Sequence, residues 1–193
     1  MYIRNYIWKG IKPFLPNGSK ERISYLFRDM ENIYNNKTVD RVKYQFNDLV
    51  LDKDYSICEL GMGTGFNLNY LKSLGFGNLS GVEFTGEGIR VCKKCYPFVN
   101  VFSGNVFDID FPVFDVVFSH MFFHLVDDRV FDVVNNHTSC FFGCFERLDR
   151  IGHLDFSLLD VDFVLVSDSV FDYKDNGCSY ICRWYKKKYD NLR

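Results

Sequence analysis

The sequence predicts an α/β protein whose sheet is mostly parallel and finishes in an antiparallel hairpin. From residue 55 onward, short apolar runs alternate with helical stretches, which is typical of βαβ units. Near the C-terminus, two segments with strand patterns are joined by residues 172–177, whose Asn-Gly ending is a strong hairpin signal. The first fifty residues instead carry apolar side chains at helical spacing. We therefore expect helices on both faces of the sheet and N-terminal helices before it.

The length of 193 residues favours one compact domain with an appendage, given about 150 residues per domain. We assign residues 1–50 to an N-terminal arm and helices that cover the substrate, and residues 51–193 to the main domain. The net charge of −2 supplies no basic field for nucleic acid, and no apolar stretch is long enough to cross a membrane. Seven cysteines, an odd number, without a recognisable secretory signal predict reduced thiols and a cytoplasmic location.

The elements follow from the spacing of apolar residues and from turn residues between them. N-terminal helices are expected after caps at Ser19 and Thr38. Strands are expected at 55–60, 78–84, 99–103, 114–119, 140–146, 163–171 and 179–185. The intervening helices are expected at 66–74, 87–96 and 127–136. The paired cysteines lie within these helix and strand patterns rather than on tight turns, so no metal site is expected.

Three glycines at alternate positions, Gly61, Gly63 and Gly65, separate the first strand from the first core helix. A sharp turn there lets a ligand lie against bare backbone, beside the free N–H groups of a helix N-terminus. A dinucleotide site would place its third glycine at position 66, which is Phe66. Glu83 ends the second strand, about 20 residues after the first glycine, where a carboxylate can accept hydrogen bonds from ribose hydroxyls. A nucleoside-containing ligand other than a dinucleotide is indicated.

The spacing Glu59-x-Gly61-x-Gly63-x-Gly65 resembles motif I of the class I S-adenosylmethionine-dependent methyltransferases. Residues 104–111 resemble the segment after that family's third strand, although Asn105 stands where an acidic residue is usual. Residues 114–124 resemble the fourth strand and the loop that follows it. The resemblance covers about residues 55 to 187. It implies a Rossmann-like sheet of seven strands that ends in the hairpin.

The resemblance also implies roles for individual residues around S-adenosylmethionine. The three glycines would pass beneath its methionine portion, Glu59 would hold its amino group, and Glu83 would bind the ribose diol. Phe84 and Val106 would enclose the adenine, while the Asn105 amide oxygen would accept from the adenine amine. Ser119, at the end of the fourth strand, would complete the cofactor site.

Methyl transfer from a sulfonium needs mainly proximity and orientation, with a base only where the acceptor must lose a proton. His124 is our preferred base and His120 the second candidate, since both follow the fourth strand on the side where such sheets bind ligands. An early helix over residues 121–125 would put both rings on one face, although His124 could equally cap or pack against the following helix.

No long insertion separates the core elements, so we expect a small acceptor, such as a sugar derivative or another metabolite, methylated on oxygen or nitrogen. Two alternatives remain open. One is a catalytically degenerate S-adenosylmethionine-binding scaffold subunit, and the other is a nicotinamide-dependent reductase on the same fold.

Overall fold

The computed structural model describes residues 36–47, 49–173 and 178–188. The predicted arm 1–18, the predicted helix after Ser19 and the hairpin turn 174–177 lie outside these residues. Nearly all of the described chain falls in one compact unit, residues 39–193. Its strands are β1 (Ser56–Leu60), β2 (Asn78–Glu83), β3 (Asn100–Ser103), β4 (Phe114–His120), β5 (Thr138–Arg147), β6 (Phe163–Tyr173) and β7 (Cys178–Lys187).

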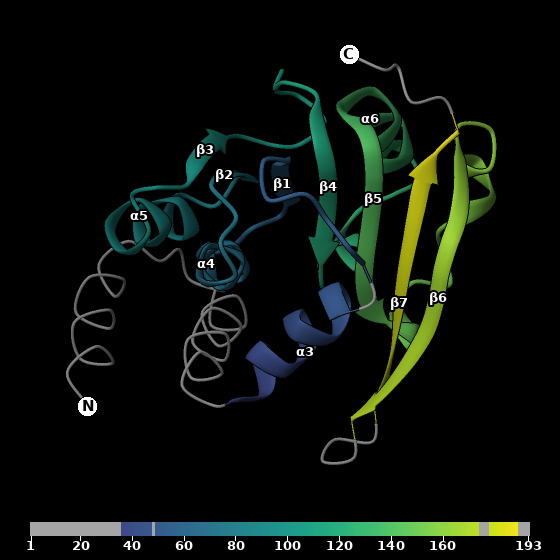
Figure 1. The fold of residues 1–193 in the computed structure, drawn as a ribbon. Helices are drawn as coiled ribbons and strands as arrows, with labels where there is room; N and C mark the ends of the chain where they lie inside the picture. The colour runs from purple at the N-terminus through teal and green to yellow at the C-terminus, as the bar shows by residue number, and fades with distance from the viewer. Residues whose placement is uncertain (1–35, 48, 174–177, 189–193) are drawn as a thin grey trace, which may run out of the picture. The chain divides into compact units, whose positions relative to one another are not determined.

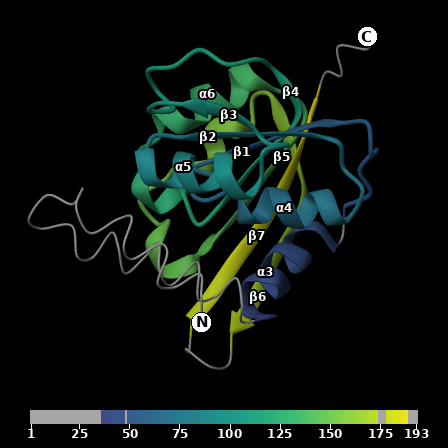
Figure 2. The ribbon, with the colours of Figure 1, turned by 90° about the vertical axis from the view of Figure 1, so that its left-hand side faces the viewer.

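These strands form one seven-stranded sheet in the order β3-β2-β1-β4-β5-β7-β6. The first five strands along the chain pair in parallel, and β7 pairs antiparallel with both β5 and β6. Figures 1 and 2 show β3 at one edge of the sheet and the long β6 and β7 hairpin at the other. The predicted seven-stranded, mostly parallel sheet with a C-terminal hairpin is confirmed.

In the described residues three helices connect consecutive parallel strands, as the apolar periodicity predicts, and another helix precedes β1. They are α3 (Asn36–Asn47), α4 (Phe66–Ser73), α5 (Gly86–Cys95) and α6 (Arg129–His137), with short 3-10 turns η2 (Phe123–Leu125), η3 (Leu148–Arg150) and η4 (Phe156–Leu159). One core joins α3 and α4 to one face of the sheet, and a second core joins α6, η2 and η4 to the other face. Both faces are covered, so nearly every residue of β1 and β4 is buried.

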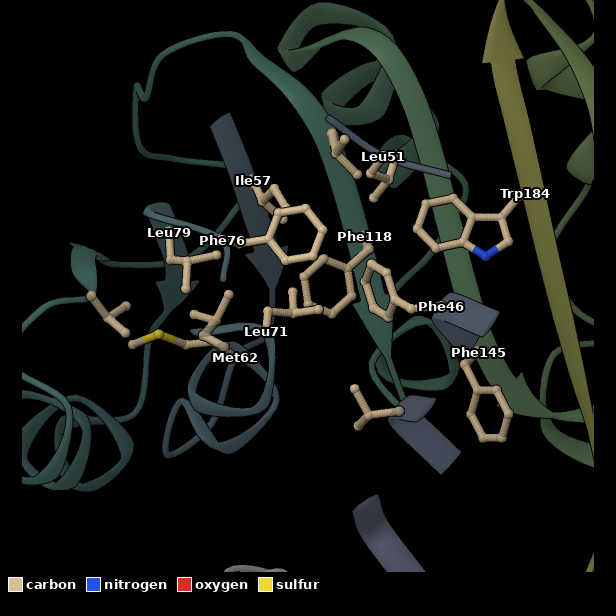
Figure 3. Packing of buried hydrophobic residues seen from close by; sticks show 14 of the residues in the cluster. Phe46, Leu51, Ile57, Met62, Leu71, Phe76, Leu79, Phe118, Phe145 and Trp184 are labelled. Atoms are coloured by element: carbon tan, nitrogen blue, oxygen red, sulfur yellow. The ribbon is translucent and has the colours of Figure 1, made fainter. Parts of the chain in front are cut away.

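Helix α3 packs on the sheet through aromatic side chains (Figure 3). The ring of Phe46 meets Phe118 and Trp184 edge to face, with centroid distances of 5.1 and 5.2 Å. The Trp184 indole N–H donates to the backbone oxygen of Gln45 at 2.6 Å. The C-terminal strand β7 and the N-terminal helix α3 are therefore joined by a buried hydrogen bond.

The observed element ends differ from the predicted ones by one to three residues. Helix α3 begins at Asn36 rather than after Thr38, and strand β5 begins at Thr138 rather than Cys140. Because the compact unit begins at Val39, most of α3 belongs with the sheet, and the proposed boundary at residue 50 stays a prediction. No helix in the described part of the chain is long and apolar enough to span a membrane.

Candidate active site

The glycine loop lies at the carboxyl end of β1 and is tied to the neighbouring strand. The N–H groups of Gly61 and Met62 both donate to the Val82 carbonyl oxygen, at 2.9 and 3.1 Å. Gly61, Gly63 and Gly65 have φ angles of 68°, 55° and 78°. Side chains rarely tolerate this left-handed region, so the sequence of alternate glycines permits a turn that other residues would strain.

Gly63 differs from the other two glycines in what surrounds it. A Cβ at Gly61 would overlap the Phe122 ring, and a Cβ at Gly65 would lie 2.6 Å from the Cys92 sulfur. A Cβ at Gly63 would meet no atom within 4 Å. The loop is packed from beneath at two glycines and left open at the middle one, which gives a cradle where a ligand can approach the backbone.

The Glu83 carboxylate is buried at the tip of β2 and faces this cradle. One oxygen accepts from the Gly63 N–H at 2.9 Å and the other from the Thr85 N–H at 2.7 Å. Each carboxylate oxygen has more than one acceptor site, so both can still accept from hydroxyl groups. The carboxylate is thus fixed in place beside the glycine loop, as binding of a ribose diol requires.

Glu59 is also buried, with 1% of its surface exposed, and lies just before the loop. Its carboxylate accepts from the Asn67 side-chain N–H group at 2.5 Å. Asn67 is in the first turn of α4, so this bond links the strand before the loop to the helix after it. A negative charge held under the loop suits a cationic amino group of a ligand.

The residues predicted to enclose adenine differ in exposure. Phe84 is 58% exposed, whereas Val106 is 6% exposed and belongs to the second core. Asn105 is exposed, and its amide oxygen accepts from the Phe107 N–H at 3.3 Å while its amide nitrogen donates to Asp108. Asn105 is therefore already engaged within its own loop, and its predicted contact with adenine requires a second acceptor position on the same oxygen.

Together these residues fit S-adenosylmethionine. The open space over Gly63 accommodates the chain of the cofactor, and two carboxylates, Glu59 before the loop and Glu83 bonded to the Gly63 N–H, are buried near it. Ser119 lies at the carboxyl end of β4, paired with Leu60, and is fully buried. Its hydroxyl has no hydrogen-bond partner among the described residues, so it can serve a ligand at this edge of the sheet.

His120 follows Ser119 and is held by Gln45, a buried residue of α3. The Gln45 amide nitrogen donates to the Ser119 carbonyl oxygen at 3.0 Å, and its amide oxygen lies 2.9 Å from His120 Nδ1. The reverse amide orientation would place two carbonyl oxygens together. Nδ1 must therefore carry the proton, which leaves Nε2 with the lone pair.

The imidazole of His120 is a weak base in this position. Burial, together with the positive charge of Arg41, lowers the pKa of His120 from 6.5 to about 3. The ring also stacks on Phe145 with a centroid distance of 4.7 Å and an interplanar angle of 3°. The sequence prediction treated His120 as a second candidate base, but a neutral ring of this pKa is suited to accepting a hydrogen bond rather than a proton.

His124, in η2, has a different partner. Its Nδ1 lies 3.0 Å from a carboxylate oxygen of Glu146, which is fully buried in β5. The other Glu146 oxygen accepts from the backbone N–H groups of Phe122 and Phe123. One carboxylate therefore fixes the His124 ring and the loop whose Phe122 side chain packs against Gly61.

The two histidines have partners that point to opposite faces of β5, whereas an early helix over residues 121–125 would have put both rings on one helix face. His120 stacks on Phe145, whereas His124 bonds to the next residue, Glu146. Consecutive residues of a strand point to opposite faces, so these partners separate the two rings. The chain crosses over at Met121, a non-glycine residue with a φ of 61°, and no regular helix covers residues 121 and 122.

Sequence reasoning missed Gln45, Asn67 and Glu146. Gln45 is a polar residue on the apolar face of a predicted helix, and Glu146 is an acid at the end of an apolar strand. A buried polar side chain needs a partner, so each position carried a signal of an interaction. The identity of the partner was not readable, because Gln45 and His120 are far apart in the sequence.

Cysteines are spread through the described elements rather than gathered at this site. Cys92 and Cys95 lie in α5, while Cys140, Cys144, Cys178 and Cys182 lie in β5 and β7. Burial raises the pKa of the Cys92 thiol to about 11. Within residues 36–47, 49–173 and 178–188, no three histidine, cysteine or acidic side chains are grouped as metal ligands.

Comparison with known proteins agrees with this geometry. Residues 58–138 match the methyltransferase domain family. No curated protein sequence matches the chain. An S-adenosylmethionine-dependent methyltransferase from Mesorhizobium loti is similar in structure, with 13% identity, a TM-score of 0.64, and coverage of 76% of this chain and 98% of that one.

Two further structures share the fold at low identity. The PH0226 protein from Pyrococcus horikoshii has 16% identity and a TM-score of 0.63, covering 80% of this chain and 91% of that one. The [4+2]-cyclase SpnF has 12% identity and a TM-score of 0.64, covering 76% and 79%. The family match over residues 58–138 and the site residues together support a class I S-adenosylmethionine-dependent methyltransferase domain, with S-adenosylmethionine as its cofactor.

Proposed function

We propose that this protein transfers a methyl group to an oxygen or nitrogen atom of a small-molecule acceptor, such as a sugar derivative or another metabolite. The observation that carries the proposal is the buried Glu146 carboxylate bound to His124 Nδ1 beside the cofactor loop. Between β1 and β6, where every residue is described, the connections carry no added domain for a large substrate. These features support a small acceptor that loses a proton.

In this proposal the chain binds the cofactor, orients the acceptor and removes a proton from the acceptor. Bound S-adenosylmethionine supplies a methyl group that its sulfonium already activates. The cofactor would be held by Glu59, Glu83, Ser119 and the three loop glycines, and its adenine by Phe84, Asn105 and Val106. His124 Nδ1–H donates a hydrogen bond to Glu146, so Nε2 carries the lone pair. This lone pair takes the proton from the acceptor O–H or N–H group.

Calorimetric titration of the full chain with S-adenosylmethionine, S-adenosylhomocysteine and NAD tests the cofactor site. We expect micromolar binding of the first two and none of NAD, since Phe66 replaces the third glycine of a dinucleotide loop. Binding of NAD alone would favour a reductase. Binding of none of the three would favour the degenerate scaffold.

A matched pair of glycine variants tests whether the cradle over Gly63 is the binding site. Gly63 and Gly75 both have positive φ angles, 55° and 96°, and a Cβ at either would meet nothing within 4 Å. Both alanine variants therefore carry backbone strain without a steric clash, on the order of 1 kcal/mol or more. Only Gly63→Ala is expected to weaken S-adenosylhomocysteine binding, by tenfold or more, while Gly75→Ala binds like the wild type.

A further inference from the structure

Resting on the function proposed above, we propose that Gln45 and His120 form the acceptor-binding element, in which His120 Nε2 accepts a hydrogen bond from an uncharged hydroxyl or N–H group of the substrate. The ligand class is thus a neutral hydrogen-bond donor, and a carboxylate or phosphate at this position is disfavoured. His120 acts here by binding the acceptor, separately from proton removal at His124.

The first step of the argument is the direction of the hydrogen bonds. Gln45 is 1% exposed, and its backbone oxygen accepts from the Trp184 indole N–H at 2.6 Å, which fixes the residue from the sheet side. Its amide then donates to the Ser119 carbonyl and accepts from His120 Nδ1. These hydrogen bonds allow only one orientation of the Gln45 amide and one tautomer of the His120 ring.

The second step is charge. An imidazolium would offer an N–H donor at Nε2 and would attract anions, but burial and the Arg41 charge keep the His120 ring neutral. A neutral ring with Nδ1 protonated offers a lone pair at Nε2. That lone pair attracts a hydroxyl or amine proton and repels a carboxylate oxygen.

The third step is position. His120 of β4 pairs with Phe145 of β5, and the Phe145 ring covers one face of the imidazole. On the other side, β4 pairs with β1, where the chain continues from Leu60 into Gly61. Because Ser119 pairs with Leu60, His120 lies one residue beyond the last β1–β4 pair, at the edge of the sheet where the glycine loop begins.

Aromatic neighbours suggest the probes. Phe145 also contacts Tyr44 of α3 and Tyr180 of β7, with centroid distances of 6.4 and 5.3 Å. Phenol and benzoate are planar, similar in size, and differ in offering a neutral donor or an anion. With the full chain saturated in S-adenosylhomocysteine, we expect phenol to bind about tenfold more tightly than benzoate in NMR titrations.

Gln45→Glu is the decisive variant. A carboxylate beside Nδ1 stabilises the imidazolium, so Nε2 gains a proton and becomes a donor. We expect the preference to reverse, with benzoate binding more tightly than phenol. A preference that stays with phenol in folded Gln45→Glu protein, or phenol binding that is absent from the wild type, overturns the proposal.

Two further variants separate recognition from folding. His120→Asn keeps an N–H near the Nδ1 position but lacks Nε2, so phenol affinity should fall about fivefold with S-adenosylhomocysteine affinity unchanged. Lys43→Gln, at an exposed residue of the same helix, is the control and should bind both probes like the wild type. Unchanged phenol affinity in His120→Asn contradicts the proposal. If the wild type does not bind S-adenosylhomocysteine, the result counts against the proposed function instead. In that case ¹⁵N NMR of His120 still tests whether Nε2 is unprotonated.

Discussion

The two histidines that follow β4 are four residues apart, yet they have opposite electrostatic surroundings. His120 faces an amide, Gln45, and the nearby charge is the positive Arg41. His124 faces a carboxylate, Glu146, which is fully buried. An amide fixes a tautomer without stabilising a positive ring, whereas a carboxylate also stabilises the protonated state that a general base reaches during catalysis.

In the functions proposed above, His120 holds the acceptor and His124 takes its proton. On the α3 face, the neutral His120 is suited to hold a substrate. On the α6 face, the Glu146 and His124 pair is suited to accept a proton. The same residue type therefore supports different roles because the neighbouring strand presents Phe145 to one ring and Glu146 to the other.

Of the substitutions that test this contrast, removal of the Glu146 carboxylate should have the largest effect, and that effect is on stability. Glu146→Ala leaves two backbone N–H groups and the His124 ring without their acceptor in a buried site. We expect a loss of about 3 kcal/mol in the free energy of unfolding, measured by urea titration. Asp149→Ala removes an exposed acid paired with Arg147 and should leave stability unchanged. Equal midpoints for the two variants would show that the Glu146 network contributes little.

Asparagine at each histidine position separates the two roles. Its amide nitrogen replaces the Nδ1 donor, while the Nε2 atom is lost. We expect His124→Asn to lower kcat by about a hundredfold with little change in KM, because a general base contributes about 10² to 10⁴. His120→Asn should chiefly raise KM for the acceptor. Release of S-adenosylhomocysteine, measured across a panel of phenols, sugars and amines, gives both constants. An unchanged kcat in His124→Asn would assign His124 a structural role.

The smallest expected effect is on stability at acid pH. The folded pKa of His120, about 3, lies below the unfolded value of 6.5, so the unfolded chain binds more protons as the pH falls. This group therefore destabilises the fold between pH 6.5 and about 3, by at most about 1.4 kcal/mol per pH unit. His120→Asn removes that contribution. The unfolding free energy of the wild type should fall relative to that of His120→Asn as the pH falls from 7 to 5, and parallel curves would contradict the low pKa.

The sheet could be predicted from sequence because its signals are local. Apolar runs, the alternate glycines and the Asn-Gly turn each lie within a few residues, and together they predicted the succession of strands and helices along the chain. The cofactor loop was located for the same reason. The position of Glu83 at the end of the second strand followed from its spacing after the first glycine, whereas its hydrogen bond with the Gly63 N–H was not predicted.

The acceptor side could not be predicted in the same way. The partner of His120 comes from α3, and the partner of His124 comes from β5, so both contacts depend on tertiary packing. Helical spacing predicted one face for the two rings, but the left-handed Met121 breaks that spacing. Backbone geometry of this kind is rare outside glycine and gives no sequence signal.

The hydrogen bond from Trp184 to the Gln45 backbone gives the protein an optical reporter beside its acceptor-binding element. The chain has two tryptophans, Trp8 and Trp184, so a Trp8→Phe protein would carry indole emission from β7 alone. Any ligand that displaces Gln45 also alters the environment of that indole. Acceptor binding can then be followed by fluorescence in real time, without a label and before the methylated product is known.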